Sequence, residues 1–427
     1  MTDIRPDRRT VLRRVRDAAA FGAAIFAAPR IGRSQGAARM VVIGGGFGGA
    51  TAARALAVSG HRVTLVERDA TFLACPLSNA VVAGLRALDE QQFGYDGLKR
   101  AGVTVAIDSA TGIDAQTRQV TLAGGSRLDY DRLVLAPGID LNFQALPGYD
   151  EAATERMPHA WKAGAQTTLL GRQLVAMADG GTVVMAVPAN PYRCPPGPYE
   201  RASLIAWYLK AHKPRSKLIM LDAKDTFSKQ RLFQRAWAEL YPGLIEWVGQ
   251  SAGGTVTAVE PAERILVTDF ARHRADVANV IPPQRAGRIA MLAGVADRSG
   301  WCPVDPGTFE SRLKPGIHVV GDAGIMGAMP KSAFAAHAQG KACAEAVAAL
   351  LAGRAPPEVR LINTCYSLVA PDYGISVAGV YRPANGLLAD IDGAGGTSPL
   401  DASRDVRRAE ARYAEAWFDT ITRDVYG

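Results

Sequence analysis

The sequence predicts an α/β protein with two Rossmann-like nucleotide-binding domains and a C-terminal α+β domain. Three observations lead to this class. An apolar run, a glycine-rich turn and an Ala-rich segment follow one another over residues 39–68, and the same alternation of strand and helix returns at residues 181–222. The pattern changes after residue 355. At 427 residues the chain is long enough for two or three domains.

The first unit reads as strand, helix and strand. Met40–Ile43 is a short apolar run that predicts a buried strand, Thr51–Ser59 is Ala-rich and predicts a helix, and Arg62–Glu67 predicts a second strand. Such a unit is a parallel βαβ motif, and its helix would begin at the carboxyl end of the first strand.

Between the first strand and the helix lies a G-x-G-x-x-G pattern formed by Gly44, Gly46 and Gly49. Gly44 would allow a tight turn, Gly46 would let the backbone approach a pyrophosphate, and Gly49 would let helix and strand pack closely. The helix N-terminus would offer free N–H groups to the phosphates. Glu67, at the end of the second strand, is placed to accept a hydrogen bond from a ribose hydroxyl.

Later elements favour FAD over NAD as the ligand of this domain. A strand at 130–136 runs into a turn at Gly138, like a turn found in FAD proteins. A second strand ends at Asp322, where two-domain flavoproteins carry an acid that binds the ribityl chain. Lys331 and the N-terminus of the helix Ser332–Leu351 could stabilise a reduced, anionic flavin, although Lys331 could equally be a surface charge. We therefore expect an FAD domain over residues 39–150 and 291–355.

The insertion at residues 151–290 has the pattern of a second Rossmann-like domain. Strands are expected at 181–187 and 217–221, with a helix at Tyr199–Lys210 between them. The turn before this helix, Pro188–Pro198, has no glycine pattern, and its prolines offer no N–H donors. This domain is therefore expected not to bind NAD(P)H.

The N-terminal segment, residues 1–38, has the features of a twin-arginine export signal. Arg8 and Arg9 are followed by an Ala-rich stretch at 18–29, which predicts a periplasmic protein. The alternatives are a disordered basic N-terminus or a membrane-surface helix. Eight arginines and three aspartates in this segment supply +5 of the net charge of +8, so the charge gives little reason to expect nucleic-acid binding. We expect neither a membrane anchor in the mature chain nor a metal site.

Residues 356–427 form the predicted closing domain. A strand is expected at 374–379, and the chain should end in a helix that carries Tyr413, Trp417 and Phe418. We expect the three aromatic side chains to share one packed face, with a partner-facing or flavin-facing cluster as the alternative.

Several long motifs together resemble the flavoprotein subunit of flavocytochrome c sulfide dehydrogenase. They are spread over residues 39–427 and comprise Val41–Gly49, Cys75-Pro-Leu-Ser-Asn79, Tyr192–Ser203, Ile281–Gly287, Gly300–Asp305 and Asn363-Thr-Cys-Tyr-Ser367. The resemblance implies a glutathione-reductase-like fold and oxidation of sulfide to sulfur or polysulfide. Electrons would pass to a c-type cytochrome subunit, since the chain itself has no C-x-x-C-H haem site.

The resemblance also assigns three of the five cysteines. It implies that Cys75 is joined to the 8α-methyl of FAD by a thioether, and that Cys194 and Cys365 form a redox-active disulfide over the flavin. A buried structural thiol and a structural disulfide are the respective alternatives. Cys302 and Cys343 are expected to be reduced core thiols.

Glu200 lies six residues after Cys194 and has two interpretations. It could handle a proton during sulfide oxidation, or it could serve as an acid at a helix N-terminus. Two other functions remain open for the chain. A sulfide:quinone oxidoreductase should carry an amphipathic C-terminal membrane anchor, whereas Arg404–Arg412 is charged on too many faces. The other is a non-catalytic flavin-binding partner of a thiosulfate-oxidising system.

Overall fold

The predicted βαβ unit is present in the structure, a computed structural model that describes residues 37–427. It consists of β1 (Arg39–Ile43), α2 (Phe47–Val58) and β2 (Arg62–Glu67), with β1 and β2 paired in parallel. Helix α2 begins at Phe47, four residues before its predicted start, so the glycine pattern runs into its first turn. The predicted export signal lies outside the described residues, apart from its last two positions.

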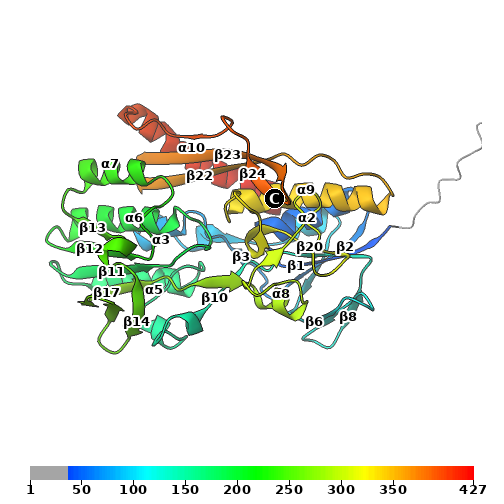
Figure 1. Cartoon of the computed structure of the whole chain (residues 1–427), viewed down its shortest axis with the longest axis horizontal. Helices are drawn as coiled ribbons and strands as arrows, with labels where there is room; N and C mark the ends of the chain where they lie inside the picture. Colours follow the sequence, from blue (N-terminus) through cyan, green and yellow to red (C-terminus); the bar gives the residue numbers. More distant parts are fainter. Residues whose placement is uncertain (1–36) are drawn as a thin grey trace, which may run out of the picture. The chain divides into compact units, whose positions relative to one another are not determined.

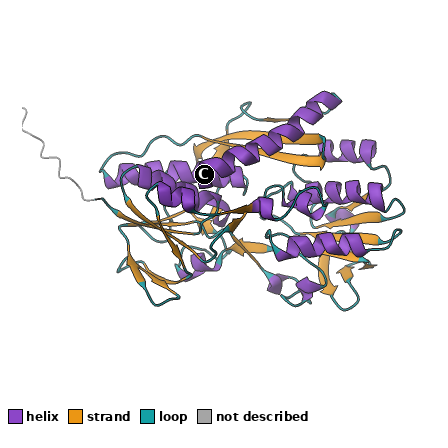
Figure 2. Ribbon diagram, turned by 180° about the vertical axis from the view of Figure 1, so that it is seen from behind, coloured by secondary structure: helices purple, strands orange, loops and turns teal. Residues whose placement is uncertain are grey.

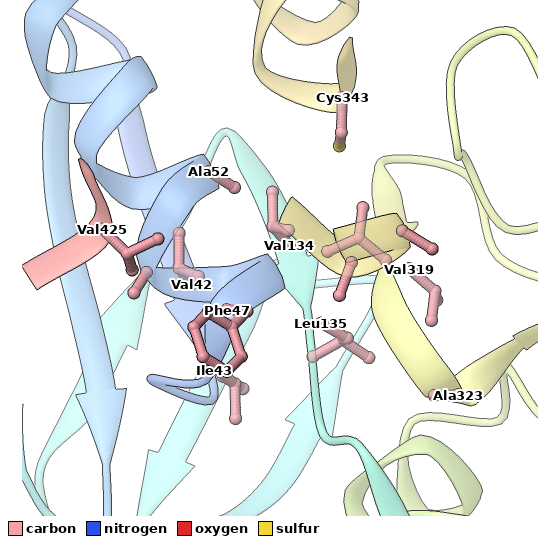
Figure 3. Close-up of a cluster of buried hydrophobic side chains, with 14 of the residues drawn as sticks. Val42, Ile43, Phe47, Ala52, Val134, Leu135, Val319, Ala323, Cys343 and Val425 are labelled. Carbon is pink, nitrogen blue, oxygen red and sulfur yellow. The ribbon is translucent and has the colours of Figure 1, made fainter. Parts of the chain in front are cut away.

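The first parallel sheet has five strands in the order β20-β9-β1-β2-β5. Its other strands are β5 (Thr104–Ile107), β9 (Arg132–Leu135) and β20 (Ile317–Val319). Helix α2 packs against α9 (Ala333–Leu351) on this sheet. Figure 3 shows how Val42, Val134 and Val319 from three neighbouring strands meet the Cys343 side of α9 in the core.

A second parallel sheet, with the order β13-β12-β11-β17, occupies the middle of the chain. Its elements are β11 (Thr182–Val187), β12 (Lys217–Asp222), β13 (Ile245–Val248) and β17 (Val277–Val280), with helices α5 (Ala165–Ala176), α6 (Gly197–His212) and α7 (Gln230–Leu240) (Figure 1). Two parallel sheets with helices packed against them confirm the predicted fold class.

Several antiparallel pieces accompany the two parallel sheets. Three-stranded sheets are formed by β6 (Ala110–Asp114), β7 (Gln119–Leu122) and β8 (Arg127–Asp129), and by β14 (Val256–Glu260), β15 (Ile265–Thr268) and β16 (Arg272–Arg274). The shorter elements are β3 (Phe72–Leu73), β4 (Gln92–Phe93), β19 (Cys302–Pro303), β21 (Gly324–Ile325), α3 (Ser78–Val82), α4 (Asp96–Arg100) and α8 (Arg288–Leu292).

A two-stranded ribbon joins the chain where it leaves the first sheet and where it returns. It pairs β10 (Ile139–Leu141) with β18 (Gln284–Ala286). The domain limits predicted at residues 150 and 290 fall just beyond this ribbon. Residues 38–427 form one compact unit, so nothing divides them at these two positions, and the predicted domain limits stay predictions.

The C-terminal part is an antiparallel sheet with one long helix. The sheet contains β22 (Leu361–Ala370), β23 (Tyr373–Ala384), β24 (Leu387–Asp390) and β25 (Gly396–Thr397), and α10 (Arg404–Tyr426) lies across it (Figure 2). Strand β22 contacts both α6 and α9, so it bridges the two parallel-sheet regions. Among the described helices, none is both long and apolar enough to cross a membrane.

The three aromatic residues of α10 do not share one face, so that prediction is wrong. Phe418 is buried and packs against Phe93, Trp417 stacks on Phe334 at a centroid distance of 6.0 Å, and Tyr413 is 57% exposed. Successive helical residues are turned by about 100°, so Phe418 points well away from the direction of Tyr413.

Candidate active site

One cavity of about 890 Å³ collects most of the predicted site residues. This volume suits a large ligand, because binding pockets span roughly 300–1,000 Å³. The cavity is lined by parts of both parallel-sheet regions and by the C-terminal sheet. The predicted site residues among its lining are Gly44, Gly46, Glu67, Cys75, Gly138, Cys194, Glu200, Asp322 and Cys365. Gly49 and Lys331 are not among the residues that line the cavity.

Two glycines of the turn at the start of α2, Gly44 and Gly49, leave no room for a side chain. Gly44 has φ +102°, and a Cβ there would come within 2.3 Å of the Ala136 carbonyl oxygen. A Cβ on Gly49 would lie 1.9 Å from the Gly44 oxygen, which fits the close packing expected of that position. Gly46 is the N-cap of α2 and lines the cavity, so backbone N–H groups of the first turn can reach a bound phosphate.

Glu67 lies at the end of β2 and holds the glycine turn in place. Its Oε2 accepts a hydrogen bond from the Gly45 N–H at 2.6 Å, and its Oε1 accepts one from the Arg68 N–H at 2.9 Å. Oε1 also accepts a hydrogen bond from the Asp69 N–H at 3.3 Å, whereas Oε2 has one partner and keeps a second lone pair for a further hydrogen bond. The contact with a ribose stays a prediction.

Asp322 gives the strongest sign that the cavity fits FAD. It follows β20, and its Oδ1 is buried without a hydrogen-bond partner in the protein. Burial raises the pKa of this carboxyl, while the positive charges of Arg193 and Lys331 oppose that rise. A buried acceptor without a partner is costly, and a ligand hydroxyl such as one of the ribityl chain would satisfy it.

Gly138, at φ +62°, makes a turn that also lines the cavity, and its carbonyl oxygen accepts a hydrogen bond from the Gly287 N–H at 3.0 Å.

Lys331 does not reach the cavity. Its Nζ donates to the carbonyl oxygens of Asp322 and Gly324, each at 2.7 Å, and lies 4.0 Å from the centre of the Trp301 ring. The ammonium group therefore stabilises the turn that carries Asp322 through hydrogen bonds to its backbone. Its predicted effect on a reduced flavin would act through this turn and stays a prediction.

Three cysteines line the cavity from three parts of the fold. Cys75 lies in the loop between β3 and α3, Cys194 lies in the turn between β11 and α6, and Cys365 is in the middle of β22. All three are free thiols in this structure, so the predicted disulfide is not formed here. Burial raises the pKa of Cys194 strongly, negative charge on Cys365 and Glu200 would raise it further, and Arg193 and Lys229 oppose the rise.

The other two cysteines are buried free thiols outside the cavity lining. Cys302 belongs to β19 and Cys343 to α9, and neither is exposed. Burial raises the pKa of Cys302 to about 12 and also raises that of Cys343. Both are therefore inert thiols at neutral pH.

Glu200 is in the first turn of α6, but its side chain does not cap that helix. Its Oε1 accepts a hydrogen bond from the Leu368 N–H at 2.8 Å, and its Oε2 accepts one from Asn79 Nδ2 at 2.7 Å. Burial raises the pKa of the carboxyl, and these two hydrogen bonds oppose the rise. The carboxylate is thus directed at the cysteine-bearing strand β22 from the first turn of α6, and both interpretations of Glu200 stay predictions.

Three cations near the cysteines were not foreseen as site residues: Arg201 and Lys229 are buried, and Arg193 is partly buried. Arg201 is 2% exposed and donates to Asn79 Oδ1 at 2.9 Å and to Asn279 Oδ1 at 3.1 Å. Arg193 donates to the Trp161 carbonyl oxygen, and Lys229 donates to the Cys365 carbonyl oxygen at 2.8 Å. Arg193 and Arg201 could have been found, because both lie inside the motif at 192–203.

In the second domain, the acid at the end of β12 is hydrogen-bonded within the protein. Asp222 ends β12 and is fully buried, and its Oδ2 accepts hydrogen bonds from Tyr199 Oη at 2.6 Å and Trp247 Nε1 at 3.0 Å. Lys224 Nζ bonds both Asp222 Oδ1, at 2.5 Å, and the Pro188 carbonyl oxygen, at 2.9 Å. The acid that could have bound a ribose therefore already has partners.

The fold and the cavity together define a flavin-dependent oxidoreductase with two Rossmann-like domains. Residues 38–175 match the family described as pyridine nucleotide-disulphide oxidoreductase. Residues 167–282 match "Sulfide dehydrogenase [flavocytochrome c] flavoprotein chain, central", and residues 357–426 match "Flavocytochrome c sulphide dehydrogenase, flavin-binding".

A sulfide dehydrogenase [flavocytochrome c] flavoprotein chain from Chlorobaculum thiosulfatiphilum is 52% identical over 48 residues, which cover all of that sequence and 11% of this chain. The chain belongs to the family of flavocytochrome c sulfide dehydrogenase flavoprotein chains.

Two more distant relatives share much of the chain. A mitochondrial sulfide:quinone oxidoreductase from Dictyostelium discoideum is 21% identical over 306 residues, 66% of this chain and 65% of that protein. The match thus spans slightly less than two thirds of that relative. The crystal structure of the sulfide:quinone oxidoreductase from Aquifex aeolicus superimposes with a TM-score of 0.72 at 18% identity, covering 91% of this chain and 92% of that one. This second likeness concerns the fold alone.

Proposed function

We propose that this chain oxidises sulfide to sulfur or polysulfide through a Cys194–Cys365 redox disulfide and a covalently bound FAD. Electrons would then pass to a c-type cytochrome subunit. The observation that carries the proposal is the meeting of Cys75, Cys194 and Cys365 on one cavity. Asp322, whose buried Oδ1 has no hydrogen-bond partner, lines the same cavity. Membership of the flavocytochrome c sulfide dehydrogenase family supports the choice of substrate and acceptor.

The cysteine pair supplies the first chemical step. A hydrosulfide anion attacks one sulfur of the Cys194–Cys365 disulfide, and its electron pair forms a new S–S bond. The bond between the two cysteines breaks, and its electron pair stays on the other cysteine as a thiolate. Bound FAD supplies the ability to accept two electrons and to release them one at a time.

Other residues of the cavity bind and orient the cofactor. The turn at Gly44 and Gly46 and the N-terminus of α2 would hold the pyrophosphate, and Asp322 would accept a hydrogen bond from the ribityl chain. Cys75 would fix the flavin through a thioether. Cys75 and Cys194 line the same cavity, and both act on the charges of Arg193 and Arg201.

Glu200 would handle the proton of hydrogen sulfide or of a leaving thiol. The carboxyl lines the cavity, and its hydrogen bonds to Asn79 and Leu368 fix its position. Burial raises its pKa, which brings the group closer to the pH at which it must exchange a proton.

The packing of α10 favours a cytochrome over a membrane quinone as the acceptor. Its apolar residues Ala411, Ala414, Phe418, Ile421 and Val425 are buried within the protein, against the C-terminal sheet and α2. That face is therefore not free to lie in a bilayer. Anaerobically reduced protein should pass electrons quickly to cytochrome c and slowly to a soluble ubiquinone analogue. The reverse order would favour a sulfide:quinone oxidoreductase, and no electron transfer to either acceptor would favour a non-catalytic flavin-binding partner.

We also propose that the chain is exported in a folded state, on the strength of the twin arginines at Arg8 and Arg9. Native purification from the periplasmic fraction should bring a haem-containing partner with the chain. A chain confined to the cytoplasmic fraction would contradict the export proposal without affecting the chemistry.

The central experiment is anaerobic stopped-flow bleaching of the flavin by sulfide. Cys194→Ser and Cys365→Ser should each stay yellow and folded, react with dithionite, and lose rapid reduction by sulfide. Cys343→Ala is the matched control, since Cys343 is a buried thiol away from the cavity. Iodoacetamide labelling before and after reduction counts the thiols. If both serine variants bleach as fast as the wild type, the pair does not carry the reaction.

A further inference from the structure

Lys229 is a buried cation that takes no part in the reaction steps proposed above. It immediately precedes α7, at φ 62°, and only 8% of the residue is exposed. Lysine is among the residues least often buried, because its ammonium loses its hydration. A lysine held inside the protein beside a reactive site is therefore a candidate for a functional charge.

The hydrogen bonds of Lys229 place its ammonium group on the cysteine-bearing strand. Nζ donates to the Cys365 carbonyl oxygen and to Ser367 Oγ, both at 2.8 Å, and to the Ile375 carbonyl oxygen at 3.5 Å. Alternate residues of a strand share one face, so Asn363, Cys365 and Ser367 of β22 point the same way. On that face Asn363, two residues before Cys365, donates from Nδ2 to Cys365 Sγ at 3.3 Å. The Lys229 ammonium group contacts Ser367, two residues after Cys365.

No carboxylate neutralises this charge. Within residues 37–427, none lies within ion-pairing distance of Lys229 Nζ, and its hydrogen-bond partners are all uncharged. Glu410 of α10 is paired with Arg407 at 3.2 Å, and Glu200 of α6 is held by Asn79 and Leu368. Burial lowers the pKa of Lys229 to about 8, while the nearby Cys365, Glu200, Cys194 and Glu410 favour the charged form. The group thus keeps its proton at neutral pH.

We propose that Lys229 is a positioning residue whose buried positive charge stabilises the negative sulfur that forms when hydrosulfide opens the Cys194–Cys365 disulfide. The inference rests on the function proposed above. In that step the sulfide electron pair makes the new S–S bond, and the electron pair of the broken bond remains on a cysteine sulfur. Lys229 offsets the resulting negative charge without giving up its proton, and it holds Cys365 in place through the backbone and Ser367.

Other charged groups act on the same sulfur atoms. Arg193, from the turn that carries Cys194, also favours its thiolate, whereas Glu200 of α6 disfavours it. Arg201 of α6 is a further buried cation in this region, and Glu410 of α10 acts on Lys229 from the side of the C-terminal sheet. Removal of Lys229 should therefore reduce, but not abolish, the positive potential at the pair.

The test measures thiolate formation rather than turnover. Reduced protein is alkylated with iodoacetamide over a range of pH, and the label at Cys194 is followed by peptide mass spectrometry. In Lys229→Met the alkylation profile of Cys194 should move to higher pH by about one unit, so that labelling at a fixed pH slows about tenfold. Lys224→Met is the control, since Lys224 is an equally buried lysine whose ammonium bonds Asp222 and Pro188 instead.

A second variant separates charge from folding. Lys229→Gln keeps a donor for the Cys365 carbonyl and removes the charge, so it should show the same shift even if the methionine variant is unstable. An unchanged Cys194 profile in folded Lys229→Gln would overturn the inference. A reaction with sulfide that survives loss of either cysteine would overturn the proposed function instead, and the alkylation profile would be unaffected by that result.

Discussion

The Glu200 carboxylate accepts a hydrogen bond from the backbone N–H of Leu368 at 2.8 Å and so ties α6 to strand β22. Leu368 lies three residues after Cys365, and Glu200 lies six residues after Cys194. One side chain thus connects the two segments that carry the reactive cysteines.

Glu200→Gln should lower the rate of flavin reduction by sulfide by about two orders of magnitude, the usual contribution of a general base. The folded-state pKa of Glu200 is raised by burial, so the wild-type rate should rise with pH as this carboxyl loses its proton. The glutamine variant should lack that limb of the profile. Stopped-flow bleaching at several pH values measures both effects.

The glutamine of Glu200→Gln has nearly the same shape as glutamate and can keep one of its two hydrogen bonds. The melting temperature of this variant should therefore fall by only a few degrees. If the variant bleaches at the wild-type rate with an unchanged pH profile, Glu200 serves only to join α6 to β22.

Cys75→Ala should lose the covalent link to the flavin. Cys75 lines the cavity and is one of its two partly buried cysteines, so its sulfur is accessible to a bound cofactor. After acid precipitation the wild type should keep yellow colour and in-gel fluorescence, and the variant should lose both. Cys302→Ser, at a buried thiol away from the cavity, should behave like the wild type. Equal retention of flavin by Cys75→Ala would exclude the thioether at this position.

His337 should make the fold sensitive to acid. Its Nδ1 lies 2.9 Å from Thr51 Oγ1 and its Nε2 lies 3.1 Å from Asp424 Oδ2, so it joins α2, α9 and α10. Burial lowers its pKa from the ordinary value of 6.5 to about 4. Between these values the unfolded chain binds the proton and the folded chain does not, so stability falls as the pH drops from 6.5 to 4.

His337→Gln should therefore show a smaller loss of melting temperature over this pH range. The buried His159 and His318 and the partly buried His61 keep part of the slope, because desolvation lowers their pKa values as well. His212→Gln, at an exposed position, serves as the control. Identical changes of melting temperature with pH for wild type and His337→Gln would show that this histidine does not contribute to the acid sensitivity of the fold.

The sequence predicted the parallel sheets well because their signals are local. Arg62–Glu67 was placed without error, and the strand at 181–187 was placed to within one residue, since buried parallel strands are short apolar runs between turns. The start of α2 was missed by four residues because glycines, which disfavour helices, form its first turn. The position of the cysteine pair followed from the resemblance, because residues 171 apart in sequence meet only through the tertiary fold.

Lys229 shows what sequence reasoning could not find. Its neighbours Ser228 and Gln230 are polar, and an isolated lysine in such a stretch is normally a solvated surface charge. Its burial results from β22 lying over the start of α7, a contact between segments more than 130 residues apart. The two arginines at 193 and 201 were within a quoted motif, but their burial depends on carbonyl and amide oxygens supplied by Trp161 and Asn79.

The last prediction is that NADH and NADPH leave the flavin oxidised. The turn between β11 and α6 is rich in proline, and prolines have no N–H groups to offer a phosphate. The carboxylate of Asp222, at the end of the next strand, is bonded by Tyr199, Trp247 and Lys224 and is fully buried. A nucleotide would have to break these hydrogen bonds and leave a buried charge without partners, at a cost of several kcal/mol. Anaerobic mixing with either nucleotide should leave the flavin spectrum unchanged, while dithionite added to the same sample should bleach it. Rapid bleaching at micromolar NADH or NADPH would mean that the second domain keeps a working nucleotide site.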